Sequence, residues 1–127
     1  MLEDNEGNSV STSELLGQPL VINFWFSTCR PCKKELPAFA AVHADLGGRI
    51  RFVGVNPLDT PEFNEPFARE RGAGYELLRD LTDDLTSKVG IVYFPVTLFV
   101  NSDGIIVRQT GVLDEAELRS YAAELIG

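Results

Sequence analysis

The feature that most constrains the fold is the stretch Leu20–Pro37, in which an apolar run leads directly into a Cys-x-x-Cys pair. The run Leu20–Phe26 is apolar on both faces apart from Asn23, which is typical of a central strand covered on both sides. From Arg30 the apolar residues recur at spacings of three and four, and this pattern predicts a helix that ends at Gly47-Gly48. The chain's only two cysteines therefore lie where a buried strand passes into a helix.

The rest of the chain alternates strands with helices and then closes with a hairpin and a last helix. The expected strands are Ile50–Val55, Tyr75–Arg79, Pro95–Val100 and Ile105–Gln109. The expected helices run from Thr60 to Arg71, from the capping group Thr82–Asp84 to Val89, and onward from the capping box Asp114-x-x-Glu117, with one earlier helical turn at Ser13–Leu16 after a tight turn at Asp4–Asn8. Pro37 and Pro66 lie inside expected helices and predict bends there. This order predicts an α/β fold with a mixed central β-sheet flanked by helices on both faces.

Composition sets the limits for function. The 127 residues suffice for one core, and no repeat or linker divides them, so we expect a single domain over residues 1–127. A net charge of −8 argues against a nucleic-acid partner, whose phosphates require Lys and Arg. No apolar run reaches the roughly 18 residues of a membrane span, and no signal sequence opens the chain. Any export signal or membrane anchor is therefore expected upstream of this sequence.

The cysteine spacing favours thiol chemistry. A thiolate is the nucleophile in disulfide exchange, and the N–H groups and dipole of a helix N-terminus stabilise that anion. Cys29 would lie just before the first turn as the exposed attacking sulfur, with Cys32 one turn later as the more buried resolving one. A two-residue gap also lets the two sulfurs form a disulfide. Arg30 adds positive charge beside the thiolate, and Pro31 suits an early helical position.

Glu35, one turn beyond Cys32, permits two interpretations. If it is partly buried, its carboxyl group can carry the proton that Cys32 loses and regains; otherwise it is a solvated helix residue. The residues alone leave both open.

Other functions fit the motif less well. Half of a zinc site would need two further ligands, and the single histidine, His43, lies about three helical turns from the pair, so no metal is expected. A purely structural disulfide would close only a short loop and restrict the unfolded chain little. A peroxidase would need proline and threonine upstream of one peroxidatic cysteine. A redox-inactive or metal-handling module, such as a copper carrier, would favour an extra His or Met nearby. We interpret the acidic run Asp80–Asp84 as a solvated loop.

These motifs resemble the thioredoxin superfamily, most closely its TlpA/ResA-like branch of thiol–disulfide oxidoreductases. The resemblance rests on Val21–Trp25 leading to Cys29–Pro37, on Val53–Asn56, and on Phe94–Val100 followed by Asn101–Gly104. It implies a thioredoxin-like fold with no cofactor beyond a redox-active Cys29–Cys32 disulfide. It also implies protein thiol or disulfide substrates, an upstream thiol reductase, and an extracytoplasmic redox or cytochrome c maturation pathway. A cytoplasmic location is the alternative, and we expect a monomer.

The resemblance also assigns residue roles. It implies that Pro95 is cis and lies beside the cysteine pair, and that Glu35 carries the proton. Five residues are expected to contact substrate: Trp25, Thr28, Arg30, Pro31 and Phe94. Asn23 stands where thioredoxin proper has a buried acid, which fits the TlpA/ResA-like branch. Thr28 departs from the tryptophan that relatives typically carry just before the first cysteine.

Overall fold

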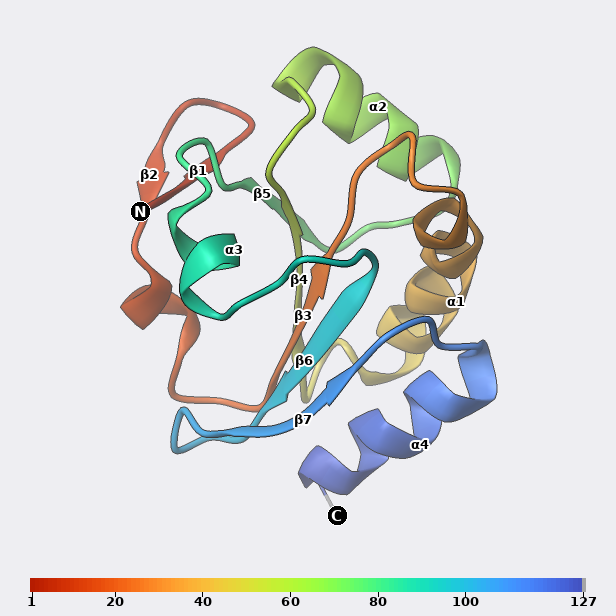
Figure 1. The fold of residues 1–127 in the computed structure, drawn as a ribbon. Helices are drawn as coiled ribbons and strands as arrows, with labels where there is room; N and C mark the ends of the chain where they lie inside the picture. The colour runs from red at the N-terminus through yellow and green to blue at the C-terminus, as the bar shows by residue number, and fades with distance from the viewer. Residues whose placement is uncertain (127) are drawn as a thin grey trace.

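The apolar run before the cysteines forms the central strand of the structure. This computed structural model describes residues 1–126, and its strands form one seven-stranded sheet in the order β2-β1-β5-β4-β3-β6-β7 (Figure 1). Strand β3 (Leu20–Phe24) pairs in parallel with β4 (Arg51–Asn56) and antiparallel with β6 (Val96–Val100). The other strands are β1 (Leu2–Asp4), β2 (Ser9–Val10), β5 (Glu76–Arg79) and β7 (Ile106–Thr110). The predicted mixed central sheet is confirmed.

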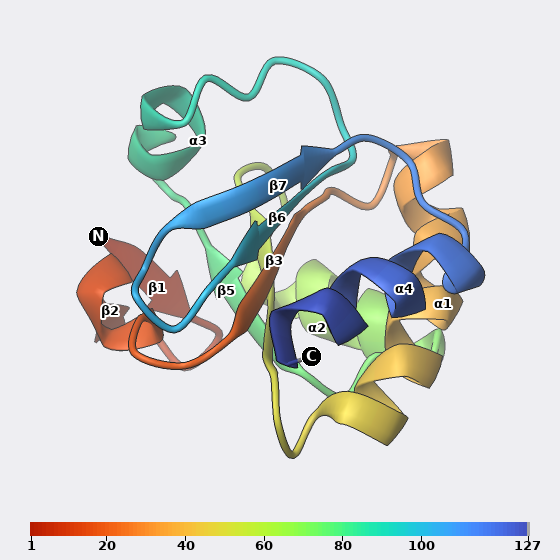
Figure 2. The ribbon, with the colours of Figure 1, turned by 90° about the horizontal axis from the view of Figure 1, so that it is seen from below.

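Helices cover both faces of this sheet, as predicted. They are α1 (Arg30–Leu46), α2 (Pro61–Glu70), α3 (Asp84–Lys88), α4 (Glu115–Ile126) and the short 3-10 helix η1 (Thr12–Leu15). Figures 1 and 2 show α1, α2 and α4 on one face, with α3 on the other. We call these faces the α1 face and the α3 face.

Alternation along β3 decides which side chain enters which layer. Val21 and Trp25 point into the apolar cluster beneath α1, whereas Leu20, Ile22 and Phe24 join the cluster beneath α3 and η1. All five residues of the strand are buried, which explains why its sequence is apolar at nearly every position. Asn23 is the exception, and its side chain belongs to the α1 face.

Predicted element boundaries differ from the observed ones mainly at the ends of β3 and of the chain. Strand β3 ends at Phe24, two residues earlier than expected, because a turn from Phe26 to Cys29 begins there, closed by the Cys29 N–H bond to the Phe26 carbonyl at 3.2 Å. The hairpin of β1 and β2 was not predicted. It flanks the expected turn at Asp4–Asn8, and its strands of three and two residues are too short to show alternation.

Helix ends follow the sequence signals closely. The capping box of α4 is present, because the Asp114 N–H donates to Glu117 and the Glu117 N–H donates back to the Asp114 carboxylate. Both α1 and α2 continue through their internal prolines, Pro37 and Pro66.

Asp80 corrects the interpretation of the acidic run as a solvated loop. Its side chain is fully buried, and it accepts hydrogen bonds from the Thr86 N–H at 2.8 Å and the Thr86 hydroxyl at 2.7 Å. A weaker bond comes from the Leu85 N–H at 3.4 Å. Asp80, rather than the expected Thr82–Asp84 group, therefore satisfies the free N–H groups of α3.

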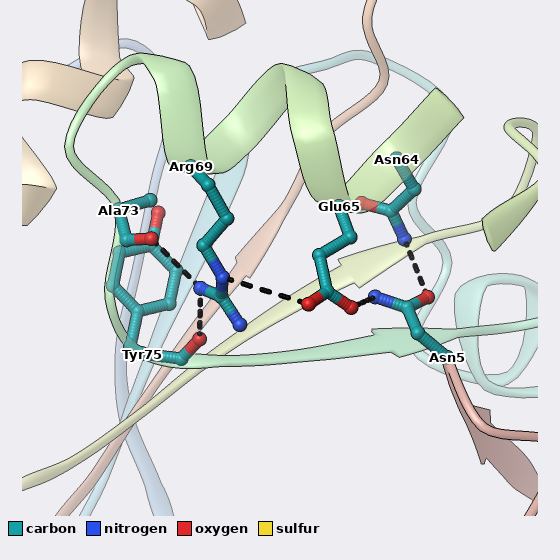
Figure 3. A network of polar contacts seen from close by, with 6 residues as sticks. All are labelled: Asn5, Asn64, Glu65, Arg69, Ala73 and Tyr75. Carbon is teal, nitrogen blue, oxygen red and sulfur yellow. Dashed lines mark hydrogen bonds and ion pairs between the residues drawn. The ribbon is translucent and has the colours of Figure 1, made fainter. Parts of the chain in front are cut away.

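A polar network fastens α2 to the sheet edge (Figure 3). Arg69 donates to the carbonyl oxygens of Ala73 at 2.7 Å and Tyr75 at 2.9 Å, so it holds the loop that leads into β5. One turn earlier, Glu65 accepts from the Asn5 side chain at 2.9 Å. The network thereby connects the N-terminal hairpin with α2, whose first residues follow the loop beside the cysteines.

Candidate active site

The cysteine pair occupies the N-terminus of α1. Cys29 is the N-cap residue, and its sulfur accepts a hydrogen bond from the Cys32 N–H at 3.3 Å. The two residues are joined by a disulfide, with their Cα atoms 5.2 Å apart. Cys32 is fully buried and Cys29 retains 7% exposure, so Cys29 is the sulfur that a partner can reach. This is the order of exposure expected from the sequence.

Three exposed cations at the start of α1 lie beside the pair. Arg30, Lys33 and Lys34 are exposed, and the first turn of α1 holds no acidic residue. None of the ion pairs within residues 1–126 uses these three side chains. They add to the partial positive charge of the helix end, and both effects favour a thiolate at Cys29.

Glu35 is buried directly behind the pair. Only 1% of it is exposed, so the interpretation as a solvated helix residue is wrong. Its carboxylate accepts from the Leu113 N–H at 2.7 Å and from the Asn23 amide at 3.1 Å. Burial raises the pKa of Glu35 to about 7, against an ordinary 4.5, although both hydrogen bonds act to lower it. Glu35 lies three residues after Cys32 on the same helix, so the two side chains are neighbours.

A polar row crosses the α1 face beneath Glu35. Asn23 is paired with Thr97 on one side and with Gly54 on the other, and Thr97 is paired in turn with Thr110. The Asn23 amide donates to the Thr97 hydroxyl at 3.2 Å as well as to Glu35. The Asn23 carbonyl oxygen has no partner within the described residues. Asn23 thus has an unused acceptor beside a carboxyl group that titrates near neutral pH.

Gly54 keeps this row compact because nothing larger fits there. A Cβ at this position would lie 3.0 Å from the Trp25 indole nitrogen and 3.3 Å from the Tyr75 ring. The glycine lets both aromatic rings approach β4 closely, next to Asn23.

Phe94 and Pro95 lie at the same end of the sheet as the cysteines. The peptide bond between them is cis, as the resemblance implied. Pro95 directly precedes β6, whose first residue Val96 pairs with Phe24, the last residue of β3. Phe94 is half-buried and packs edge-on against Phe26, with ring centroids 5.1 Å apart. This contact joins the segment before Pro95 to the turn before Cys29.

The expected substrate-contacting residues divide into two groups. Thr28, Arg30 and Pro31 are exposed beside Cys29, and Phe94 is half-buried. Trp25 is fully buried and stacks on Phe67 at 6.0 Å, so its ring does not reach the surface and the expected substrate contact there is wrong.

Three contacts at the site were not predicted. They are the Asn23–Glu35 bond, the Leu113–Glu35 bond and a pair of bonds from Ser27 to Asp59. A polar residue inside an apolar strand, such as Asn23, was the only sequence signal among them.

Comparisons with known proteins place this arrangement in a family. The family model described as AhpC/TSA matches residues 1–109. The chain belongs to the AhpC/TSA family. Among its relatives, thiol-disulfide oxidoreductase ResA of Bacillus subtilis is 27% identical over 123 residues, which cover 95% of this chain and 69% of ResA. Sporulation thiol-disulfide oxidoreductase A of the same organism is 26% identical over 129 residues, covering 98% of this chain and 78% of that protein.

Solved structures agree with this family membership. The structure of MTB dsbF, described in mixed oxidized and reduced forms, superposes with a TM-score of 0.87 at 26% identity, covering 97% of this chain and 92% of dsbF. The predicted thioredoxin-like fold and TlpA/ResA-like resemblance are confirmed. Within residues 1–126, no helix is both long and apolar enough to cross a membrane.

Proposed function

We propose that this protein is a thiol–disulfide oxidoreductase that exchanges disulfides with protein thiols through Cys29 and Cys32. The carrying observation is the disulfide at the N-terminus of α1, in which Cys29 retains 7% exposure and Cys32 is fully buried. The names of the relatives, thiol-disulfide oxidoreductase ResA and sporulation thiol-disulfide oxidoreductase A, support the same activity.

The exchange consists of two balanced displacements. In the reducing direction, the Cys29 thiolate attacks a substrate disulfide, forms a mixed disulfide and releases one substrate thiolate, which takes up a proton. Cys32 then loses its proton and attacks the Cys29 sulfur, which releases the second substrate thiolate and forms the Cys29–Cys32 disulfide. The substrate gains two electrons and two protons, and the reverse sequence oxidises a dithiol.

Glu35 is the proposed proton acceptor for Cys32. Cys32 is buried, so its proton needs a neighbouring base that is itself shielded from water. A carboxyl group with a pKa of about 7 can take or give a proton near neutral pH, as general acid–base chemistry requires. Pro95, with Phe94, is proposed to support the substrate chain beside Cys29. Thr28, Arg30 and Pro31 are the proposed substrate contacts on the helix side.

The ResA-like relatives also support an extracytoplasmic location, protein substrates and reduction of the pair by an upstream thiol reductase. The proposed unit of action is a monomer. The direction of electron flow follows from the reduction potential of the pair, which equilibration with a glutathione buffer measures.

Trapping tests the roles of the two cysteines. We expect Cys29→Ser to abolish reduction of insulin, since it removes the sulfur that partners reach, and to trap no substrate. Cys32→Ser should also lose turnover but accumulate a mixed disulfide at Cys29, visible on a non-reducing gel. Trapping by Cys29→Ser, or insulin reduction at the wild-type rate by this variant, would contradict the assignment.

A further inference from the structure

The turn before Cys29 is held by a residue outside the proposed mechanism. Within the turn from Phe26 to Cys29, Ser27 directs both of its donors to the side chain of Asp59. The Ser27 N–H donates to one carboxylate oxygen at 2.8 Å, and its hydroxyl donates to the other at 2.9 Å. Ser27 is buried and Asp59 is half-buried, so water competes little for these bonds.

Asp59 is itself fixed to the sheet. Asn56, the last residue of β4, donates its amide to the Asp59 carboxylate at 2.7 Å. The Asn56 amide oxygen accepts from the N–H groups of Leu58 and Asp59, both at 2.9 Å. Arg79 at the end of β5 donates to the Asp59 carbonyl at 3.1 Å. A residue held by two strands, through its carboxylate to β4 and its backbone carbonyl to β5, therefore fixes the backbone two residues ahead of the attacking sulfur.

This arrangement has two physical consequences for Cys29. It fixes the turn that delivers the sulfur to the helix N-terminus, where small displacements change the N–H contacts that stabilise a thiolate. It also brings a carboxylate to the turn that leads into Cys29, and a nearby negative charge disfavours a thiolate. Position and charge thus act on the same sulfur in opposite directions.

We infer that Asp59 is a positioning residue that holds the Cys29 turn through Ser27 and shifts the Cys29–Cys32 couple toward the reducing side. The inference rests on the proposed disulfide exchange. Asp59 does not take part in the displacement steps; it acts only through the placement and the electrostatic surroundings of Cys29.

Substitutions separate the two effects. In Asp59→Asn, the amide oxygen can accept from the Ser27 N–H and from Asn56, and the amide nitrogen can donate to the Ser27 hydroxyl, so the contacts persist and only the charge is lost. Ser27→Ala removes one bond and keeps the charge. Asp59→Ala removes both hydrogen bonds to Ser27 and the negative charge. Glu62→Gln is the matched control, because Glu62 is an exposed acid in the first turn of the nearby α2.

The readouts are the equilibrium constant of the couple against glutathione and the Cys29 pKa from thiolate absorbance. We expect Asp59→Asn to shift that constant about 3- to 10-fold toward the reduced form, the upper end corresponding to about 30 mV, and to lower the Cys29 pKa. Asp59→Ala should slow exchange with a disulfide substrate about tenfold or more, with Ser27→Ala between it and wild type. Glu62→Gln should change neither.

The inference would be overturned if Asp59→Asn and Glu62→Gln have equal equilibrium constants and Ser27→Ala exchanges at the wild-type rate. This test does not require that Asp59→Ala folds. Failure of the proposed function is distinguishable. It would appear as wild-type protein that reduces no protein disulfide, whereas the glutathione equilibrium of the couple remains measurable in every variant.

Discussion

The two faces of the central sheet are built from the same strands but have different contents. The α3 face buries only aliphatic and aromatic side chains from β3, β4 and β6, such as Ile22, Val53 and Leu98. The α1 face contains, among its apolar residues, the row from Thr110 to Gly54 and the carboxyl group of Glu35 above it. One residue along β3 is enough to move from one environment to the other.

The difference separates stability from chemistry. Burial of apolar side chains stabilises the folded protein, whereas burial of a charged carboxyl group destabilises it. The protein carries that cost next to its cysteines. Changes on the α3 face should therefore alter stability alone, and changes on the α1 face should alter proton and redox behaviour.

The largest expected change in stability is on the α3 face. Leu98 is 2% exposed within the apolar cluster, so Leu98→Ala should lower the free energy of unfolding by about 2–5 kcal/mol through lost burial and a cavity. Urea titration measures this. The reduction potential of the folded variant should match wild type, and a shifted potential would show that the two faces are coupled.

Glu35 should make the protein less stable as pH rises, whereas an ordinary paired acid makes a protein more stable as pH rises. Its pKa is about 7 in the folded protein, above the ordinary 4.5. Between these values the folded chain binds a proton that the unfolded chain lacks, so stability falls as pH rises from about 4.5 to 7 and then levels off. The total loss is about 3 kcal/mol.

Glu35→Gln should remove this pH dependence. The Gln oxygen can accept from Leu113, and its amide can donate to Asn23 once the Asn23 side chain rotates to present its unused oxygen. Urea titrations at several pH values, with the exposed Glu62→Gln as control, should show a loss between pH 4.5 and 7 in the control and not in Glu35→Gln. Parallel profiles would mean that Glu35 titrates normally and would remove the basis for its proton role.

The smallest expected change tests the row itself. Thr97→Val removes the hydroxyl that accepts from Asn23 and should lower the free energy of unfolding by about 1 kcal/mol. Thr110→Val, one strand further, removes a buried hydroxyl that has no partner within residues 1–126. It should lower the free energy of unfolding by less than Thr97→Val does, or raise it. Equal costs would show that the Asn23–Thr97 bond contributes nothing specific.

The features that could be predicted from the sequence are those that depend on a local pattern of residues. The buried strand, the helix beginning at Arg30 and the order of exposure of the two cysteines follow from apolar spacing and from the N-terminus of a helix. The ends of short elements were less predictable, because the hairpin of β1 and β2 has too few residues to show a period.

The contacts that define the site depend on chain segments far apart in sequence. Glu35 meets Asn23 and a backbone N–H 78 residues away, and Ser27 meets Asp59 across 32 residues. No local pattern encodes such pairs. Asp80 was misinterpreted for a different reason: its partner Thr86 is near in sequence, but only the folded chain shows that the carboxylate turns inward to the N–H groups of α3.

The bond from the Leu113 N–H to Glu35 has a consequence for observing the site. Leu113 lies in the connection between β7 and α4, and its amide proton points directly at the carboxyl oxygen. Ionisation of that carboxyl group changes the field at the amide, so the Leu113 resonance in an NMR spectrum should move with the Glu35 proton. A backbone signal near the end of the chain would then report the protonation state of the carboxyl group behind the cysteines.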